Sequence, residues 1–239
     1  MKQHRREFAP PLLDAVARMA EKEERPILTV DVVLFTVRGG TLQVALQRRD
    51  RSPFKGRLAL IGGYVHVDED ADTGETARRV LREKAGLSGL YLEQLMTFSG
   101  AGRDPRGWSA SVAYYALVPE EALAPAIEHG LSIIPVEEVA SLPFDHEAIV
   151  AEGVKRLQSK GAYSSLPAFL LPREFTMPQL REIYETVMRT SLNDSAFRRK
   201  VEELQLIEPV SGAFSKASAR PAQLYRLRKA VLQEFDRKL

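Results

Sequence analysis

Short apolar runs, separated by turn-forming residues, occupy the first two thirds of the chain. Runs of this length that are rich in β-branched residues predict β-strands. We expect strands at residues 27–37, 42–49, 58–65, 91–99, 108–118 and 131–136. Gly39 and Gly40 indicate a hairpin between the first two strands. Asp31 interrupts the first run; we expect an edge position in the sheet for it and keep a pocket position as the alternative.

Two longer segments have the spacing of helices. Residues 73–85 repeat apolar side chains at i, i+3 and i+4, and Gly86 ends the segment. The stripe consists of Ala77, Val80, Leu81 and Ala85. A second helix is predicted at 144–161, and strands and helices in this order indicate an α/β domain. We assign residues 27–163 to this domain and residues 1–26 to an N-terminal helical extension.

The pattern changes after Gly161. Prolines punctuate residues 164–172, which predicts a linker. Thr176 then caps one helix, and a short turn leads to a second helix at 195–204. Their buried positions are Leu180, Ile183, Tyr184, Val187, Phe197, Val201 and Leu204. Two apolar runs around the polar loop 211–221 follow. Two helices and a hairpin resemble a winged helix-turn-helix, which we assign to residues 164–239.

Positive charge is concentrated in this last third. Residues 165–239 hold 13 Lys and Arg against 9 Asp and Glu, whereas residues 1–164 hold 21 against 23. Basic side chains fix a winged helix on DNA phosphates, and its second helix donates to base edges. The candidate DNA-binding residues are Asn193, Ser195, Arg198, Arg199, Lys200, Lys216 and Arg220. The alternative for the helix is a solvated face whose basic residues pair with Glu202 and Glu203.

Residues 62–87 resemble a Nudix box. The family pattern is Gly, five residues, Glu, seven residues, then Arg-Glu-apolar-x-Glu-Glu-x-Gly-apolar. The frame residues that match are Arg79, Leu81, Gly86 and Leu87. Of the three glutamates in that frame only Glu83 is present, since Val80 and Lys84 occupy the other two positions. The first glutamate position is Glu69 counted forward from the glycines and Ala71 counted back from the arginine, so the loop is two residues longer than the pattern.

The changed residues remove chemistry that Nudix hydrolysis needs. Oxygen ligands hold Mg²⁺ or Mn²⁺, and the metal polarises the phosphoryl group and activates water. Val80 cannot bind a cation, and Lys84 adds a positive charge. We therefore predict a nucleotide pocket with no catalytic residues and no metal site. Two alternatives stay open. One is an active hydrolase of ADP-ribose or another nucleoside diphosphate derivative, in which Glu69, Glu75 and Glu83 gather a cation. The other is a coincidental Gly-Gly before an amphipathic helix.

An arginine-rich loop contributes candidates for the pocket. Arg103 and Arg106 can each donate two parallel hydrogen bonds to a phosphate, and Trp108 offers a flat face for stacking. Arg48 and Arg49, which end the second strand, form a second pair. The candidate effector-binding residues are Arg48, Arg49, Gly62, Gly63, Arg103, Asp104, Arg106 and Trp108. The alternative is a hairpin loop with solvated arginines.

Composition narrows the classes of protein. The 239 residues, 44% of them hydrophobic, suit two modest domains with real cores. Without cysteine, the chain has no disulfide, thiolate metal site or cysteine nucleophile. No apolar run reaches the roughly 18–20 residues of a membrane span, and the N-terminus is no secretory signal, so we expect a cytoplasmic protein. His66 and His146 belong to no set with metal spacing, and we interpret them as structural residues.

These features, in this order, resemble the Nudix-related transcriptional regulators, typified by NrtR-like repressors of NAD metabolism. The resemblance spans residues 27–228 and rests on residues 28–31, 79–84, 103–109, 144–146, 196–200 and 219–225. It implies a Nudix fold, an α/β/α sandwich with a mixed sheet, followed by a C-terminal winged helix-turn-helix. It also implies a homodimer that represses NAD biosynthesis or salvage genes, binds double-stranded operator DNA and releases it on sensing ADP-ribose or an NAD-related nucleotide. No cofactor is required. The remaining alternative is an inactive Nudix protein whose tail binds protein.

Overall fold

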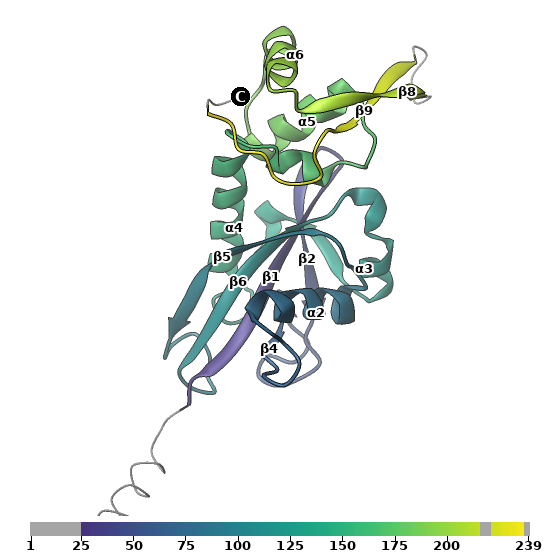
Figure 1. The fold of residues 1–239 in the computed structure, drawn as a ribbon. Helices are drawn as coiled ribbons and strands as arrows, with labels where there is room; N and C mark the ends of the chain where they lie inside the picture. The colour runs from purple at the N-terminus through teal and green to yellow at the C-terminus, as the bar shows by residue number, and fades with distance from the viewer. Residues whose placement is uncertain (1–24, 216–220, 237–239) are drawn as a thin grey trace, which may run out of the picture.

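The structure, a computed structural model, describes residues 25–215 and 221–236. Of the helical extension expected at residues 1–26, only residues 25 and 26 lie inside this range. Lys216 and Arg220 lie outside it. Within the described part, an α/β body occupies one end of the molecule and a smaller body of helices and a hairpin occupies the other (Figure 1). Among the helices of these residues, none combines the length and apolarity needed to cross a membrane.

A seven-stranded mixed sheet forms the centre of the α/β body. Its strands are β1 (Ile27–Arg38), β2 (Thr41–Arg48), β3 (Leu58–Ala59), β4 (Ile61–Tyr64), β5 (Tyr91–Gly100), β6 (Ser109–Leu117) and β7 (Ser132–Pro135). Their order is β3-β2-β1-β6-β5, with β4 paired to β1 and β7 to β2. The edge position expected for Asp31 is wrong, because Asp31 pairs with Gly62 of β4 on one side and Ala113 of β6 on the other.

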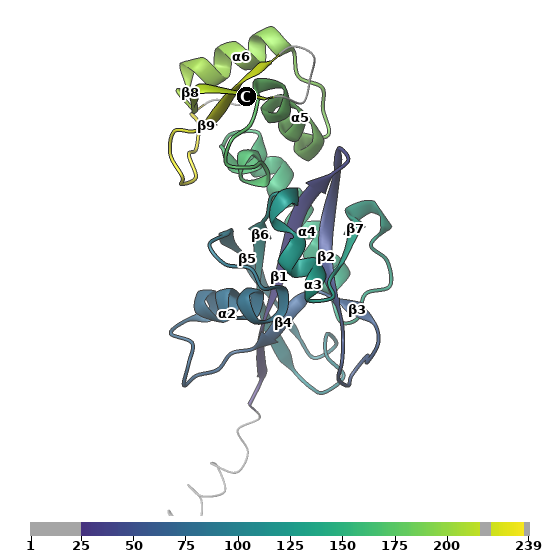
Figure 2. The same cartoon turned by 90° about the vertical axis from the view of Figure 1, so that its right-hand side faces the viewer.

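Helices cover both faces of the sheet, as Figure 2 shows for α2 (Thr73–Ala85) and α4 (His146–Gly161). Alternate residues of β1 point to opposite faces. Val30 and Val32 therefore pack in the cluster that contains α2 and the short α3 (Ala124–Glu128), whereas Val33 and Phe35 pack in the cluster that contains α4. Two single-turn 3₁₀ helices, η1 (Glu120–Ala122) and η2 (Val136–Glu138), complete this body. The expected α/β/α sandwich with a mixed sheet is confirmed.

The strand expected at 58–65 is two strands. At Leu60, between β3 and β4, the backbone N–H donates to Nδ1 of the buried His146 at 3.0 Å instead of to a neighbouring strand. As a result β3 pairs with β2, and β4 pairs with β1. In β4, Gly62 pairs with Asp31 of β1, and Gly63 lies against Val80 of α2.

The C-terminal body has the elements of a winged helix-turn-helix. They are α5 (Met177–Met188), α6 (Asp194–Glu203), β8 (Ile207–Ser215) and β9 (Ala222–Leu227). Thr176 caps α5 as predicted, with its hydroxyl and the Gln179 side chain forming a reciprocal capping box. Phe197 and Val201 are buried as predicted, and Leu204 is partly buried. The other residues of α6 are exposed, apart from the half-buried Asp194 and Lys200.

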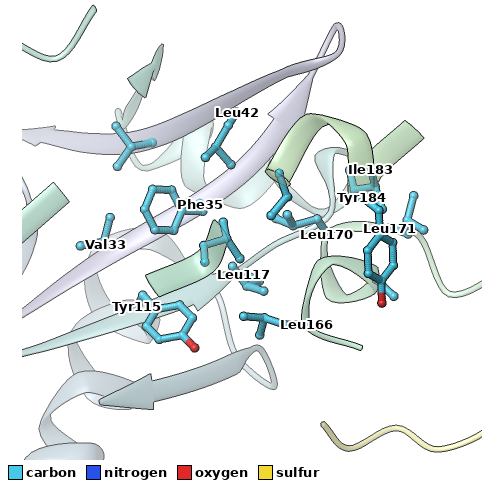
Figure 3. Close-up of a cluster of buried hydrophobic side chains, with 14 of the residues drawn as sticks. Val33, Phe35, Leu42, Tyr115, Leu117, Leu166, Leu170, Leu171, Ile183 and Tyr184 are labelled. Carbon is cyan, nitrogen blue, oxygen red and sulfur yellow. The ribbon is translucent and has the colours of Figure 1, made fainter. Parts of the chain in front are cut away.

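The segment predicted as a linker is packed. Residues Leu166–Leu170 form the 3₁₀ helix η3, and Leu166 and Leu170 are buried. They lie in one hydrophobic cluster with Phe35 and Tyr115 of the sheet and Tyr184 of α5 (Figure 3). The chain after β9 returns to this segment, where the Ser165 N–H donates to the Gln233 carbonyl at 2.8 Å. The two bodies therefore share one core. The boundary placed at residue 163 stays a prediction.

Candidate functional sites

A cavity of about 770 Å³ lies where β1 and β4 face α2 and two loops. This volume falls in the usual range for small-molecule sites. The charged residues that line it, histidines aside, are Asp31, Arg48, Arg49, Asp50, Arg51, Arg79, Glu83, Lys84, Arg103, Asp104 and Arg106. Basic side chains outnumber acidic ones by seven to four, so an anion is the kind of ligand that the cavity favours.

Asp31 and His146 form the floor of the cavity. The Asp31 carboxylate accepts a hydrogen bond of 2.6 Å from the Ser111 hydroxyl and lies 3.5 Å from Nε2 of His146. Burial lowers the pKa of His146, and its Nδ1 accepts the Leu60 N–H. Both observations indicate a neutral imidazole that carries its proton on Nε2. The structural role of His146 stays a prediction, whereas the pocket position kept as an alternative for Asp31 is the one observed.

The two arginines of the loop that were predicted to bind phosphate, Arg103 and Arg106, each form an ion pair with a carboxylate. Arg103 donates to both oxygens of Asp145, at 2.9 and 2.8 Å, and its side chain is buried. Arg106 donates from Nε to Oδ1 of Asp104 at 2.9 Å and from Nη2 to Oδ2 at 2.6 Å, and it also donates to the Tyr64 hydroxyl. These bidentate pairs hold the loop in place and neutralise its charge. A ligand would have to compete with Asp145 or Asp104 for these donors.

The second arginine pair has a different environment. Within the described residues, Arg48, Arg49 and Lys84 line the cavity without forming an ion pair to any carboxylate. Arg48 and Arg49 donate to backbone carbonyls, at 2.6 Å to Gly56 and 2.8 Å to Pro53. Lys84 donates to the carbonyl of Gly62. Burial lowers the pKa of Arg49 and of Lys84, and the more distant carboxylates of Asp31 and Asp50 offset only part of this effect.

The altered Nudix box is held together by Asp70. Arg79 donates from Nε and Nη2 to the two oxygens of Asp70, both at 2.8 Å. Asp70 lies between the two positions, 69 and 71, that the alternative ways of counting the motif give. Although neither counted position holds the pairing carboxylate, the longer loop supplies one from Asp70 to the frame residue Arg79. These hydrogen bonds hold the pKa of Asp70 far below its ordinary range.

Val80 and Lys84 change the cavity wall. The Val80 side chain is buried against Gly63. A β-carbon at position 63 would lie only 3.0 Å from Cγ2 of Val80, so a glycine at this position leaves room for the valine. Glu83 lines the cavity and lies 3.4 Å from Nη1 of Arg79. Within the residues that the structure describes, no group of three or more His, Asp or Glu side chains could hold a metal ion. The residues present do not fit the divalent metal that Nudix hydrolysis uses.

Aromatic residues of the cavity were not identified from the sequence. The Phe144 ring centroid lies 4.9 Å from the Arg49 guanidinium carbon and 6.0 Å from that of Arg106, and Phe54 meets the same ring edge-on. Trp108, the predicted stacking face, does not line the cavity, and 49% of it is exposed. The sequence could have indicated this part of the cavity through the run Phe-Asp-His at 144–146. Phe144 contributes the ring, Asp145 pairs with Arg103, and His146 lies on the cavity floor.

The exposed side of α6 forms the second candidate site. Asn193 caps the helix, accepting a hydrogen bond of 3.0 Å from the Ala196 N–H. Ser195, Arg198 and Arg199 are exposed, and Lys200 is half-buried. Arg198 pairs with Asp194 at 2.9 Å, and Arg199 pairs with Glu203 at 3.8 Å. Exposed pairs of this kind contribute little to stability, so both guanidiniums are available to a stronger anionic partner.

The fold and the cavity together define a Nudix domain joined to a winged helix. A family model described as the NUDIX domain matches residues 25–157, and one described as the NrtR DNA-binding winged helix domain matches residues 167–227. The "ADPR responsive transcriptional repressor NtrR" of Acinetobacter baylyi is 38% identical over 215 residues, which are 88% of this chain and 84% of that relative.

Two solved structures extend this similarity. NrtR of Shewanella oneidensis, complexed with a 27mer DNA, superposes with a TM-score of 0.81 at 34% identity, over 89% of this chain and 99% of that chain. The NUDIX domain of the same protein, complexed with ADP ribose, gives a TM-score of 0.52 at 33% identity, over 59% and 97%. The chain belongs to the NrtR family of Nudix-related transcriptional regulators.

Proposed function

We propose that this protein is a transcriptional repressor that binds operator DNA through its winged helix and releases it when ADP-ribose, or a related nucleotide, occupies the Nudix cavity. The observation that carries the proposal is a cavity with cations free of carboxylate partners in a body that shares its core with a winged helix. The names of the relatives support the two ligands: one is an ADPR responsive repressor, and NrtR of Shewanella oneidensis was crystallised with DNA and, as its NUDIX domain, with ADP ribose.

The rival function, hydrolysis of ADP-ribose or another nucleoside diphosphate derivative, needs carboxylates at the cavity. Of the three glutamates that could gather a cation, only Glu83 lines it. Glu69 contacts His66 at 3.2 Å, and Glu75 pairs with Arg78 at 2.9 Å. Val80 and Lys84 add no oxygen ligand. A bound pyrophosphate would therefore not be cleaved, and occupancy of the cavity can act as a signal.

On the DNA side, α6 enters the major groove. Arg198 and Arg199 donate to base edges or phosphates, and Asn193, Ser195 and Lys200 position the helix on the backbone. Lys216 and Arg220, which lie outside the described residues, are the candidates for further phosphate contacts. The protein acts in the cytoplasm as a homodimer, because a two-fold pair of winged helices reads a pseudo-palindrome. The family resemblance makes NAD biosynthesis or salvage genes the first targets to test.

A gel-shift titration on the protein's own promoter region tests this function. Added ADP-ribose should raise the Kd for DNA about 5- to 150-fold, the usual range of allosteric coupling. Calorimetry should then show ADP-ribose binding more weakly to the operator complex than to the free protein by the same factor, since coupling is reciprocal. Equal affinity of ADP-ribose for both forms would exclude it as the effector, and NAD would be tested next.

A further inference from the structure

Lys84 occupies a position of the Nudix box where the family pattern has a glutamate, yet its side chain still points to the cavity. Its ammonium group donates to the carbonyl of Gly62 on β4. An ammonium has three N–H donors. Because Gly62 is its one acceptor among the described residues, two donors are left to face the cavity.

Arg49 provides a second cation of the same kind, from the end of β2. It has no carboxylate partner among the described residues, and its positive charge contributes to lowering the pKa of Lys84. Both side chains line the same cavity. Burial is the larger cause of the lowered pKa. A partly desolvated pair of cations is stabilised by an anion between them.

The same position cannot serve a divalent metal. Mg²⁺ and Mn²⁺ require oxygen ligands, and the wall of α2 offers Val80, Glu83 and the ammonium of Lys84 instead. The ammonium would also repel a metal ion placed beside Glu83. The ammonium of Lys84 thus supplies, at this position, the positive charge that a metal ion would contribute.

We propose that Lys84 is a nucleotide-binding residue, whose ammonium contacts the pyrophosphate of the effector and makes its binding independent of divalent metal. The inference rests on the proposed function, since it concerns the same cavity, and it adds the residue and the metal requirement. Lys84 and Arg49 would hold the pyrophosphate from two sides, while Arg103 and Arg106 keep the carboxylate partners described above.

Calorimetric titration of the full-length protein with ADP-ribose, in EDTA and in Mg²⁺, tests the proposal. The wild type should give the same Kd in both. Lys84→Met should raise the Kd about ten- to hundredfold, the usual effect of losing a charged hydrogen bond. Lys84→Arg, which keeps the charge, should recover most of the affinity. Lys155→Met, at an exposed lysine of α4, is the matched control and should bind as the wild type does.

The outcomes separate this inference from the function on which it rests. Wild-type binding that needs Mg²⁺, or Lys84→Met binding as tightly as the wild type, would overturn the role of Lys84 while leaving ADP-ribose as the effector. A wild type that binds no ADP-ribose in either buffer would overturn both. A thermal melt and operator binding by each variant without nucleotide verify the fold, so a lost affinity is assigned to the cavity.

Discussion

The guanidinium of Arg79 and the carboxylate of Asp70 form two parallel hydrogen bonds of 2.8 Å, across a loop that is longer than the family pattern. Asp70 also accepts hydrogen bonds from the His66 N–H, at 2.9 Å, and from the Thr76 hydroxyl, at 2.8 Å. One carboxylate therefore ties the loop between β4 and α2 to the first turns of α2. The frame arginine of the Nudix box is thus held by a carboxylate from the longer loop.

This pair predicts the acid sensitivity of the fold. The pKa of Asp70 is far below its ordinary value of 3.8 in the folded state. A depressed pKa stabilises the fold at pH values above 3.8, and the contribution is lost as the pH falls through the lower folded-state value. Urea unfolding should show Asp70→Asn to be less stable than the wild type at neutral pH, with the difference shrinking on acidification. Asp68→Asn, at an exposed position, should have no such effect. A pH-independent difference would contradict the prediction.

The altered box predicts the absence of turnover. With Val80 and Lys84 at two ligand positions, ADP-ribose and NADH should be hydrolysed far below the usual enzyme range of about 1–10³ s⁻¹, in Mg²⁺ and in Mn²⁺. The measurement is phosphate release after coupling to a phosphatase. Turnover inside that range would restore the hydrolase as the function.

The position of Phe144 predicts which ring binds a base. Phe144 lies in the cavity beside Arg49, whereas Trp108 lies outside it. Phe144→Ala should weaken ADP-ribose binding by roughly 1–3 kcal/mol, the range for a base stacked on an aromatic side chain. Trp108→Ala should leave the calorimetric Kd unchanged. The reverse ranking of the two variants would return the stacking role to Trp108.

The exposed arginines of α6 predict the effect of substitutions on DNA binding. Arg198→Ala or Arg199→Ala should each weaken operator binding by roughly 1–3 kcal/mol and relax sequence preference, if the side chain reads a guanine. Arg220→Ala should weaken all sequences alike and reduce the salt slope by about one. Fluorescence anisotropy over a salt series gives both quantities, with Lys155→Ala as the control. A triple variant that is folded and binds the operator normally would refute this surface.

Local patterns predicted most of the elements, because apolar periodicity depends on near neighbours. The stripe of α2 and the cap of α5 are of this kind, and both are confirmed. Asp31 was misplaced because its strand partners come from segments 31 and 82 residues away, at Gly62 and Ala113. Nothing near position 31 in the sequence marks it as central.

The ion pairs of the cavity could not be predicted from the sequence either, because their partners are also far apart along the chain. Arg103 and Asp145 are 42 residues apart, so the charge of the arginine-rich loop could be counted but its neutralisation could not be foreseen. Prolines at 167 and 172 suggested a loose linker, yet the apolar residues between them pack in the core. The roles assigned to the site residues stay predictions.

Helix α4 links the two ends of the molecule. Its first residue, His146, lies on the cavity floor, and its last, Gly161, packs against Pro167 and Val187 of the C-terminal body. Sixteen residues of α-helix make a rod about 24 Å long. Between its ends the helix packs on the sheet, where Gly153 lies against the ring of Phe35. A nucleotide that displaces the cavity floor would therefore act first on a helix whose other end lies in the core beneath the winged helix.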